Sequence, residues 1–151
     1  MIAAVIRRAT ADEAPAVADI FLAARRAIEN LVPMAHTDDD TRRWMRDVVF
    51  REDEVTVAIM DGRIAAMMAT RPGWIDHLYV DPRFQGRGLG GALIQHARHG
   101  AHGAGGLQLW TFQANAGARR FYARHGFAEV AFTDGGGNEE RRPDVKLAWA
   151  P

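Results

Sequence analysis

A glycine-rich loop is the part of this sequence whose residue types and spacing point most directly to chemistry. Residues 85–91 read Gln-Gly-Arg-Gly-Leu-Gly-Gly, follow a predicted strand and open a predicted helix. The N-terminus of a helix presents free backbone amides and a partial positive charge, which together bind phosphate. Glycines let a ligand approach those amides closely. The pattern therefore predicts a phosphate-binding loop rather than a flexible turn.

The same loop also matches the dinucleotide fingerprint G-x-G-x-x-G at Gly86, Gly88 and Gly91. A dinucleotide site needs an acidic residue about 20 positions further on, to bind the ribose hydroxyls. The next acidic residue is Glu129, which disfavours a nicotinamide-dependent oxidoreductase. The lysine-containing phosphate loop G-x-x-x-x-G-K-[ST] is absent from the sequence. We therefore expect the loop to bind a ligand with several phosphates, and we expect no acidic residue to bind the ribose of that ligand.

The loop lies inside a long segment that contains no acidic residue. Residues 82–128 lack Asp and Glu but carry six arginines and four histidines. The whole chain has 19 basic and 19 acidic residues, so its formal net charge is zero. The zero total argues against general nucleic-acid binding, whereas the acid-free segment suits one specific anion.

Length and composition indicate a globular protein. We expect residues 1–151 to form a single domain, because 151 residues can bury one sizeable core. The chain contains no cysteine, which excludes disulfides, thiolate nucleophiles and cysteine-bound zinc. No apolar run approaches the ~18 residues of a membrane span, and the N-terminus lacks the order of a signal peptide. A cytoplasmic protein without a membrane partner is the expectation.

The elements that must position the loop follow from hydrophobic periodicity. Two helices are predicted after a first strand. The spacing of apolar residues then changes from the helical period to the alternation typical of strands, and Asp61-Gly62 is predicted to form a tight hairpin turn between two of these strands. The expected strands are 2–8, 54–60, 63–70, 74–80, 107–112, 127–133 and 145–149, and the later helices are 88–99 and 115–125. This order predicts a mixed α/β (α+β) fold, with an antiparallel first half followed by a βαβ unit whose two strands are parallel.

Taken together, these residues resemble the GNAT superfamily of N-acetyltransferases. Its acetyl-CoA motif [QR]-x-x-G-x-[GA] stands here at residues 85–90, after the strand-and-turn lead-in Leu-Tyr-Val-Asp-Pro at 78–82. Asn115, Phe121-Tyr122 and Gly126-Phe127 complete the family pattern. The resemblance implies a mostly antiparallel sheet with a central parallel βαβ unit that binds acetyl-CoA, and with helices on both faces.

The resemblance also implies roles for individual residues. The backbone of residues 78–80 would pair with the pantetheine arm like an added strand, and the amides of residues 86–91 would hold the pyrophosphate. Asn115 would contact the pantetheine, in addition to serving as an N-cap, and Tyr122 would protonate the departing thiolate, unless it is only a core residue. The implied donor site is Leu78, Tyr79, Val80, Gln85, Gly86, Arg87, Gly88, Leu89, Gly90, Gly91 and Asn115, with no metal.

The general base is the point at which this sequence departs from the family pattern. Many relatives carry a glutamate five residues before the asparagine, where this chain has Trp110. Another branch uses a titratable residue on the preceding strand, a position that matches Asp76. Because side chains alternate along a strand, we expect Asp76 to share a face with Trp74 and Leu78, and His77 to face the other way. Asp76 is the predicted base, directly or through water, and His77 or a water chain is the alternative.

Two further groups of residues have weaker interpretations. His96, His99 and His102 spread around a helix, so a solvated basic face explains them better than a metal site. The resemblance implies an acceptor mouth at residues 30–41 and 134–144. The acidic residues of these segments would attract a cationic amine, or would merely cap helices and solvate a loop. Trp110, Phe112 and Trp149 are either core residues or walls of the acceptor pocket.

The function that the resemblance implies is transfer of an acetyl group from acetyl-CoA to a primary amine of a small molecule or protein, by direct attack in a ternary complex. Asp76 and Tyr122 are the catalytic residues in this hypothesis. The alternative is a CoA sensor of the same fold that does not turn over, because the usual glutamate is missing. The sequence leaves open whether the chain forms a homodimer, and it predicts no nucleic-acid partner.

Overall fold

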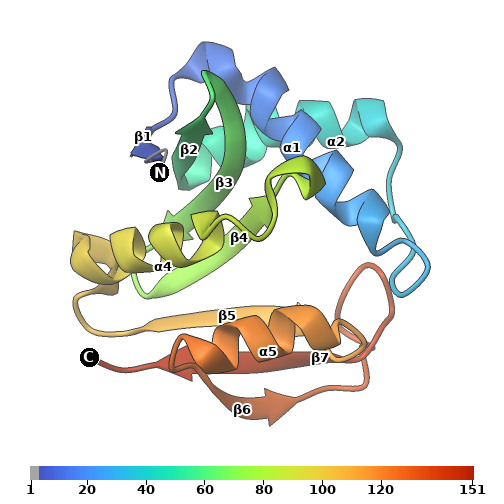
Figure 1. The fold of residues 1–151 in the computed structure, drawn as a ribbon. Coiled ribbons are helices and arrows are strands. Elements are labelled where there is room, and N and C mark those ends of the chain that lie inside the picture. The colour runs from blue at the N-terminus through green and yellow to red at the C-terminus, as the bar shows by residue number, and fades with distance from the viewer. Residues whose placement is uncertain (1–3) are drawn as a thin grey trace.

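A twisted sheet runs through the computed structural model, which describes residues 4–151 (Figure 1). Residues 2 and 3 of the first predicted strand lie outside this range. Within residues 4–151 the sheet has seven strands in the order β1-β2-β3-β4-β5-β7-β6. These strands are β1 (Val5–Arg8), β2 (Glu54–Met60), β3 (Arg63–Arg71), β4 (Trp74–Val80), β5 (Leu107–Phe112), β6 (Ala128–Phe132) and β7 (Asp144–Trp149).

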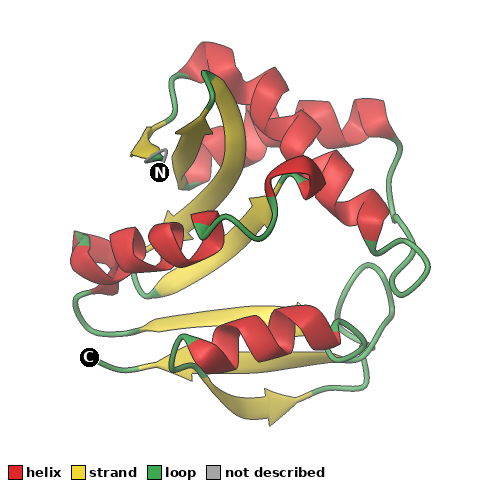
Figure 2. Cartoon of the chain, viewed as in Figure 1, coloured by secondary structure: helices red, strands yellow, loops and turns green. Residues whose placement is uncertain are grey.

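Helices cover both faces of this sheet, as predicted (Figure 2). The first face carries α1 (Ala14–Ala27) and α2 (Asp38–Trp44), which continues through a π-helical turn (Met45–Val49) into α3 (Phe50–Glu52). The second face carries α4 (Leu89–His99) and α5 (Ala116–Arg124). None of the helices in the described part of the chain has the length and apolar character that a membrane span requires.

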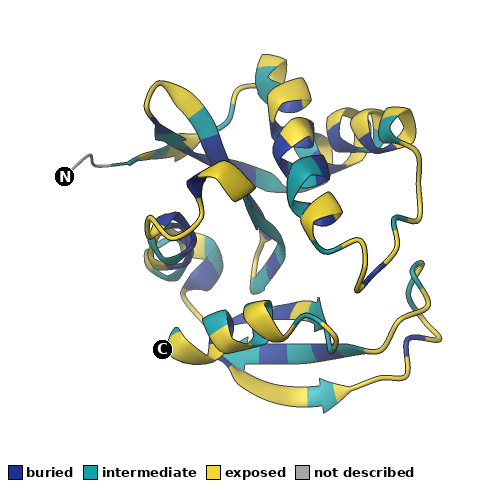
Figure 3. Ribbon diagram, turned by 45° about the vertical axis from the view of Figure 1, so that its right-hand side comes forward, coloured by how far each residue is buried: buried dark blue, intermediate teal, exposed yellow. Residues whose placement is uncertain are grey.

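Each face of the sheet has its own apolar core, because neighbouring side chains along a strand point to opposite faces. In β3, Met67 packs under α1 and Met68 packs under α4. The inward faces of the helices are correspondingly buried, while their outer faces are exposed (Figure 3). Burial of these two apolar faces is the main favourable contribution to folding.

The two central strands separate after a single point of contact. All neighbouring strands are antiparallel except β4 and β5, which are parallel as the βαβ prediction requires. Their only register pair within residues 4–151 is Trp74 with Gln108, supported by a 2.9 Å hydrogen bond from the Gln108 amide to the Gly73 carbonyl. Beyond this point β4 and β5 diverge (Figure 1). The β4 edge facing β5 is therefore available to another partner.

Candidate active site

A cavity of about 770 Å³ lies where β4 and β5 diverge. It is lined by every residue of the implied donor site except Arg87, and also by Tyr122 and Asp76. Residues that are up to 46 positions apart in the sequence, from Asp76 to Tyr122, are thus brought to one place. The fold gathers the predicted donor residues around the gap in the sheet.

The glycine-rich loop has two structural uses. Gly86 and Gly88 adopt left-handed backbone conformations, with φ of +78° and +81°, and Gly88 is the N-cap of α4. A Cβ atom at either position would meet nothing within 4 Å, so the loop backbone borders open space. At Gly90, by contrast, a Cβ atom would lie 2.9 Å from Cζ of Phe121, which means that this glycine lets α4 and α5 pack closely.

Arg87 is the one residue of the loop whose side chain leaves the cavity. Its guanidinium lies 3.5 Å from the Asp61 carboxylate and 5.3 Å from the centre of the Phe84 ring, beside the β2–β3 hairpin. In this arrangement the Arg87 side chain is engaged with the hairpin and not with the cavity.

Helix α5 positions Asn115 and Tyr122 at the same cavity. The Asn115 side-chain oxygen accepts a 3.1 Å hydrogen bond from the Ala118 amide, so the predicted N-cap is confirmed. Tyr122 is only 7% exposed and packs edge-on against Phe121 and Phe127. Burial raises the pKa of the Tyr122 hydroxyl, so this group is a neutral proton donor at physiological pH.

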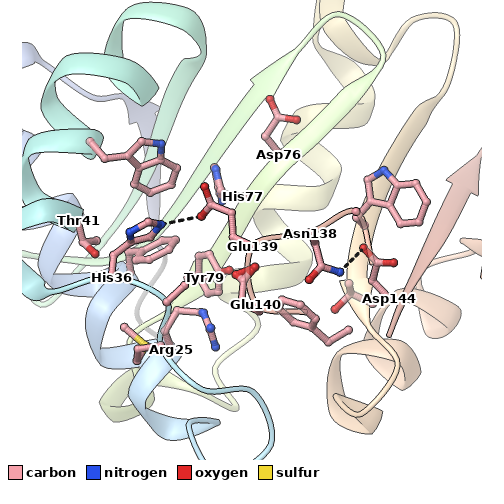
Figure 4. Close-up of a pocket in the computed structure, with 18 of the residues that line it drawn as sticks. Arg25, His36, Thr41, Asp76, His77, Tyr79, Asn138, Glu139, Glu140 and Asp144 are labelled. Carbon is pink, nitrogen blue, oxygen red and sulfur yellow. Dashed lines mark hydrogen bonds and ion pairs between the residues drawn. The ribbon is translucent and has the colours of Figure 1, made fainter. Parts of the chain in front are cut away.

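A second cavity, of about 790 Å³, adjoins the first (Figure 4). Both predicted mouth segments line it, as do the aromatic rings of α1 and α2. The 2.7 Å contact between His36 Nε2 and Glu139 Oε2 joins the two segments across the cavity. Six residues of β4 and β5 line both cavities, namely Asp76, His77, Tyr79, Trp110, Thr111 and Phe112.

A β-bulge in β4 corrects the predicted orientation of Asp76. Thr70 of β3 pairs with Ile75 and Ala69 pairs with His77, so Asp76 is an extra residue without a partner in β3. An extra residue shifts the alternation of side chains by one position. The expectation that Asp76 and His77 face opposite sides is therefore wrong, and both side chains line the second cavity.

Asp76 belongs to a cluster of charged groups with Arg71 and Asp53. Arg71 donates two hydrogen bonds to the Asp76 carboxylate, of 2.5 and 2.8 Å. Burial opposes ionisation, but the hydrogen bonds from Arg71 and Asp53 lower the pKa of Asp76 below its usual value. Burial and then the adjacent Asp76 carboxylate raise the pKa of Asp53 to about 7. The two carboxyl groups therefore titrate as a coupled pair, in which Arg71 favours the ionised form of Asp76.

His77 occupies an aromatic environment. Its ring centre lies 5.1 Å from that of Trp44 and 5.8 Å from that of Phe21. Burial lowers the pKa of His77 to about 4, so the imidazole is neutral at pH 7. The same low pKa makes the imidazole a weak base, so the position of His77, and not its basicity, keeps it as the second predicted candidate.

The structure distinguishes between the alternative interpretations of the remaining tryptophan, phenylalanine and histidine residues. Trp110 and Phe112 line both cavities, whereas the Trp149 ring stacks under Arg98, whose guanidinium carbon lies 4.7 Å from the ring centre. His102 lies after the end of α4, where its Nδ1 is 3.3 Å from the Thr70 hydroxyl. In the described residues, no three His, Cys, Asp or Glu side chains form a group that could hold a metal ion.

Comparison with known proteins assigns the chain to a family. Residues 49–129, more than half of the chain, match the family model of the acetyltransferase (GNAT) domain. The chain belongs to the GNAT acetyltransferase family. The matched residues run from the end of the π-helical turn to the start of β6, and so include the glycine-rich loop, Asp76, Asn115 and Tyr122.

Two archaeal relatives are both described as N-acetyltransferases. An uncharacterized N-acetyltransferase of Methanocaldococcus jannaschii is 28% identical over 145 residues, covering 86% of this chain and 63% of that protein. An uncharacterized N-acetyltransferase of Archaeoglobus fulgidus is 29% identical over 133 residues, covering 78% of this chain and 88% of that protein. The chain thus spans less than two thirds of the Methanocaldococcus jannaschii protein.

Solved structures share the fold along nearly the whole chain. The apo form of YjaB from Escherichia coli has a TM-score of 0.79 at 22% identity and covers 97% of each chain. The structure of yncA from Salmonella typhimurium with its cofactor acetyl-CoA has a TM-score of 0.72 at 18% identity, covering 98% of this chain and 94% of that one. At these identities the likeness establishes the GNAT fold.

The second cavity includes residues that the sequence interpretation missed. Arg25 of α1 lines the second cavity, as do Phe21 and Trp44. A signal was present in the sequence, because Arg25 follows Ala18 by seven residues and Phe21 by four. These spacings place it on the buried face of a helix. The neighbours of Arg25 itself were not evident, because Phe112 of β5 and Tyr79 of β4 are far from it in the sequence.

Proposed function

We propose that this GNAT protein transfers the acetyl group of acetyl-CoA to a primary amine by direct attack, with both substrates bound together. The observation that supports this is the meeting of two cavities at the divergence of β4 and β5. One cavity holds the residues of the donor motif, and the other is walled by aromatic and acidic side chains. We also propose that residues 1–151 form one acetyltransferase domain.

The donor cavity suits the parts of acetyl-CoA. The free edge of β4 at residues 78–80 would pair with the pantetheine arm, and the amides at the start of α4 would hold the pyrophosphate. When bound, acetyl-CoA supplies an acetyl group activated as a thioester. Tyr122 lines this cavity, and its hydroxyl carries a proton at neutral pH, so we propose that this hydroxyl protonates the departing thiolate.

The attacking amine must be neutral, which requires that its proton leave. Asp76 lines both cavities as a carboxylate, and we propose that it directs this proton away through water. Its pairing with Arg71 makes it a weak base, so solvent must be the final acceptor. His77 lies beside it on the same cavity and is the alternative route.

We expect Asp76→Asn to reduce kcat/KM most strongly at low pH, where the acceptor amine is protonated, with partial recovery as pH rises. General acid–base groups contribute about 10²–10⁴-fold, and relay through water places the expected loss at the lower end. Measuring the pH–rate profiles of Asp76→Asn and His77→Gln side by side tests the assignment. A wild-type profile for Asp76→Asn, together with a shifted profile for His77→Gln, would transfer the role to His77.

We expect acetyl-CoA and CoA to raise the melting temperature of the protein and NAD to leave it unchanged. A ligand that binds only the native state adds about 2.7 kcal/mol at a hundredfold excess over Kd, which corresponds to roughly 5–10 °C for a domain of this size. Thermal unfolding with each ligand measures this effect. Stabilisation by NAD and not by acetyl-CoA would refute the donor assignment.

Release of CoA thiol on addition of a panel of primary amines tests the transfer itself. Acetyl-dependent thiol release with at least one amine, and formation of the acetylated amine by mass spectrometry, is the expected result. Binding of acetyl-CoA without transfer to any amine, peptide or protein acceptor would favour the CoA sensor.

A further inference from the structure

Arg25 is a buried cation that lines the second cavity without a carboxylate partner. Its side chain is 4% exposed, and it lies near Tyr79 and Glu140 at the edge of the cavity (Figure 4). Its hydrogen bonds are two long ones of 3.4 Å, to the carbonyls of Val32 and Pro33. Within residues 4–151, no Asp or Glu oxygen lies within 4 Å of its nitrogens.

A buried guanidinium of this kind needs an explanation. Arginine stays charged in proteins, and removing an unpaired charge from water is costly. The other arginines of α1 and α2 are exposed and paired, as in the ion pairs of Arg26 with Asp38, Arg42 with Asp19 and Arg43 with Asp40. Arg25 therefore differs from its neighbours both in its burial and in the lack of an anionic partner.

The acidic groups of the same cavity are mostly engaged elsewhere. Asp40 pairs with Arg43, Asp76 with Arg71, and Glu139 with His36, while Asp144 accepts hydrogen bonds from Thr133 and Asn138. Glu140, which is half-buried, has no hydrogen bond or ion pair in the described part of the chain. The cavity thus offers a buried cation and a separate anion, an arrangement that suits a ligand carrying both charges.

Arg25 also lies close to the junction of the two cavities. Its guanidinium carbon is 5.7 Å from the centre of the Phe112 ring, and Phe112 lines both cavities. The Arg25 charge also acts on the hydroxyl of Tyr79, another residue that lines both. An anionic group bound by Arg25 would therefore lie a short distance from the place where the acetyl group is transferred.

We propose that the acceptor is a small amine that carries a carboxylate near its reacting nitrogen, as in an amino acid, and that Arg25 binds this carboxylate. The proposal rests on the proposed acetyl transfer and narrows its acceptor class. The planar guanidinium can donate two parallel hydrogen bonds to a carboxylate. A carboxylate fits better than a phosphate dianion, because Arg25 is a single cation among several carboxylates.

The test compares amino acids with their amides as acceptors in wild type and in Arg25→Met, which removes the guanidinium and its charge but keeps an unbranched apolar stem. Pairs such as phenylalanine and phenylalaninamide, and likewise leucine, methionine and lysine, differ only in the carboxylate. We expect Arg25→Met to reduce the acid-to-amide ratio of kcat/KM by about ten- to a hundredfold, as for loss of a charged hydrogen bond. Because only this ratio is compared between proteins, differences in amine pKa cancel.

Arg26→Met is the matched control, since Arg26 is the next residue of α1 but is exposed and lies outside the cavity. It should keep the wild-type ratio. If Arg25 only fastens the Val32–Pro33 loop, Arg25→Met will slow acids and amides equally, and that result would overturn the proposal. A wild type that acetylates amines without preference for the carboxylate would overturn it as well, while leaving the acetyl transfer itself established.

Product binding decides the question if none of these acceptors is turned over. Calorimetry on the CoA complex compares N-acetylphenylalanine with N-acetylphenylalaninamide. Tighter binding of the acid by wild type, and loss of that difference in Arg25→Met, would support the proposal. Equal affinities for the acid and the amide in both proteins would refute the role of Arg25. Failure of the proposed acetyl transfer would be seen separately, as the absence of both thiol release and stabilisation by acetyl-CoA.

Discussion

Gly88→Glu is expected to abolish binding of acetyl-CoA while leaving the protein folded. Gly88 is the N-cap of α4, and a side chain there would extend into open space, because a Cβ atom meets nothing within 4 Å. A glutamate would add bulk and negative charge where the helix N-terminus should hold the pyrophosphate. Thermal shift and calorimetry with acetyl-CoA measure the loss, and far-ultraviolet circular dichroism monitors the fold.

Gly73→Glu is the matched control for backbone strain. Gly73 has a φ of +80°, close to the +81° of Gly88, and its Cβ position is likewise free of atoms within 4 Å. Each substitution forces an L-residue into the left-handed region, which costs about 1–2 kcal/mol. Gly73 lines neither cavity, so the control should lose stability but keep its affinity for acetyl-CoA. Unchanged affinity in folded Gly88→Glu would mean that the loop does not hold the ligand.

The donor side of the site was predictable because its signals are local. The glycines of residues 85–91, the strand before them and the start of α4 are contiguous in sequence, so spacing alone places phosphate-binding amides at a helix N-terminus. Asn115 and Tyr122 are seven residues apart on one helix, and this spacing brings them to one face. The order of strands and helices was equally local, because each element shows its own period.

The second cavity was predictable only as the two mouth segments, because the arrangement of its side chains depends on pairing between distant segments. Alternation along β4 gave the wrong face for Asp76, since nothing in residues 74–80 reveals that β3 pairs around an extra residue. The charge cluster of Asp76 with Arg71 and Asp53 also arises only after three segments come together. Arg25 had the spacing of a buried residue, but its exposure to the cavity depends on where β5 and the β6–β7 loop lie.

The divergence of β4 from β5 joins these two sides into one site. A fully paired sheet would satisfy the backbone groups of residues 75–80 with β5 and would leave no gap for a ligand. In this protein the strands meet at Trp74 and Gln108 and then separate, and both cavities are lined by the residues of β4 and β5 that border this gap. In the proposed function the reacting groups would meet at this gap, next to the cavity that Tyr122 lines.

Tyr122→Phe is expected to lower kcat by about 10²–10⁴-fold, the usual contribution of a general acid. The substitution removes one hydroxyl from a side chain that is 7% exposed and packed between Phe121 and Phe127, so the ring contacts persist. KM for acetyl-CoA and the thermal shift caused by CoA should change little. A fall in kcat that exceeds any change in KM is the pattern of an interaction made only as the thiolate leaves.

Comparison with Tyr79→Phe identifies which hydroxyl supplies the proton, because Tyr79 is the only other tyrosine of the chain. Tyr79 lines both cavities, whereas Tyr122 lines the first. Steady-state kinetics with the best acceptor, measured from pH 6 to pH 9, should show the larger loss in Tyr122→Phe at every pH. Burial keeps the Tyr122 hydroxyl protonated across this range, so the defect should not depend on pH. If Tyr122→Phe retains full kcat and Tyr79→Phe does not, Tyr79 is the acid; if both retain it, the thiolate leaves without a proton from either tyrosine.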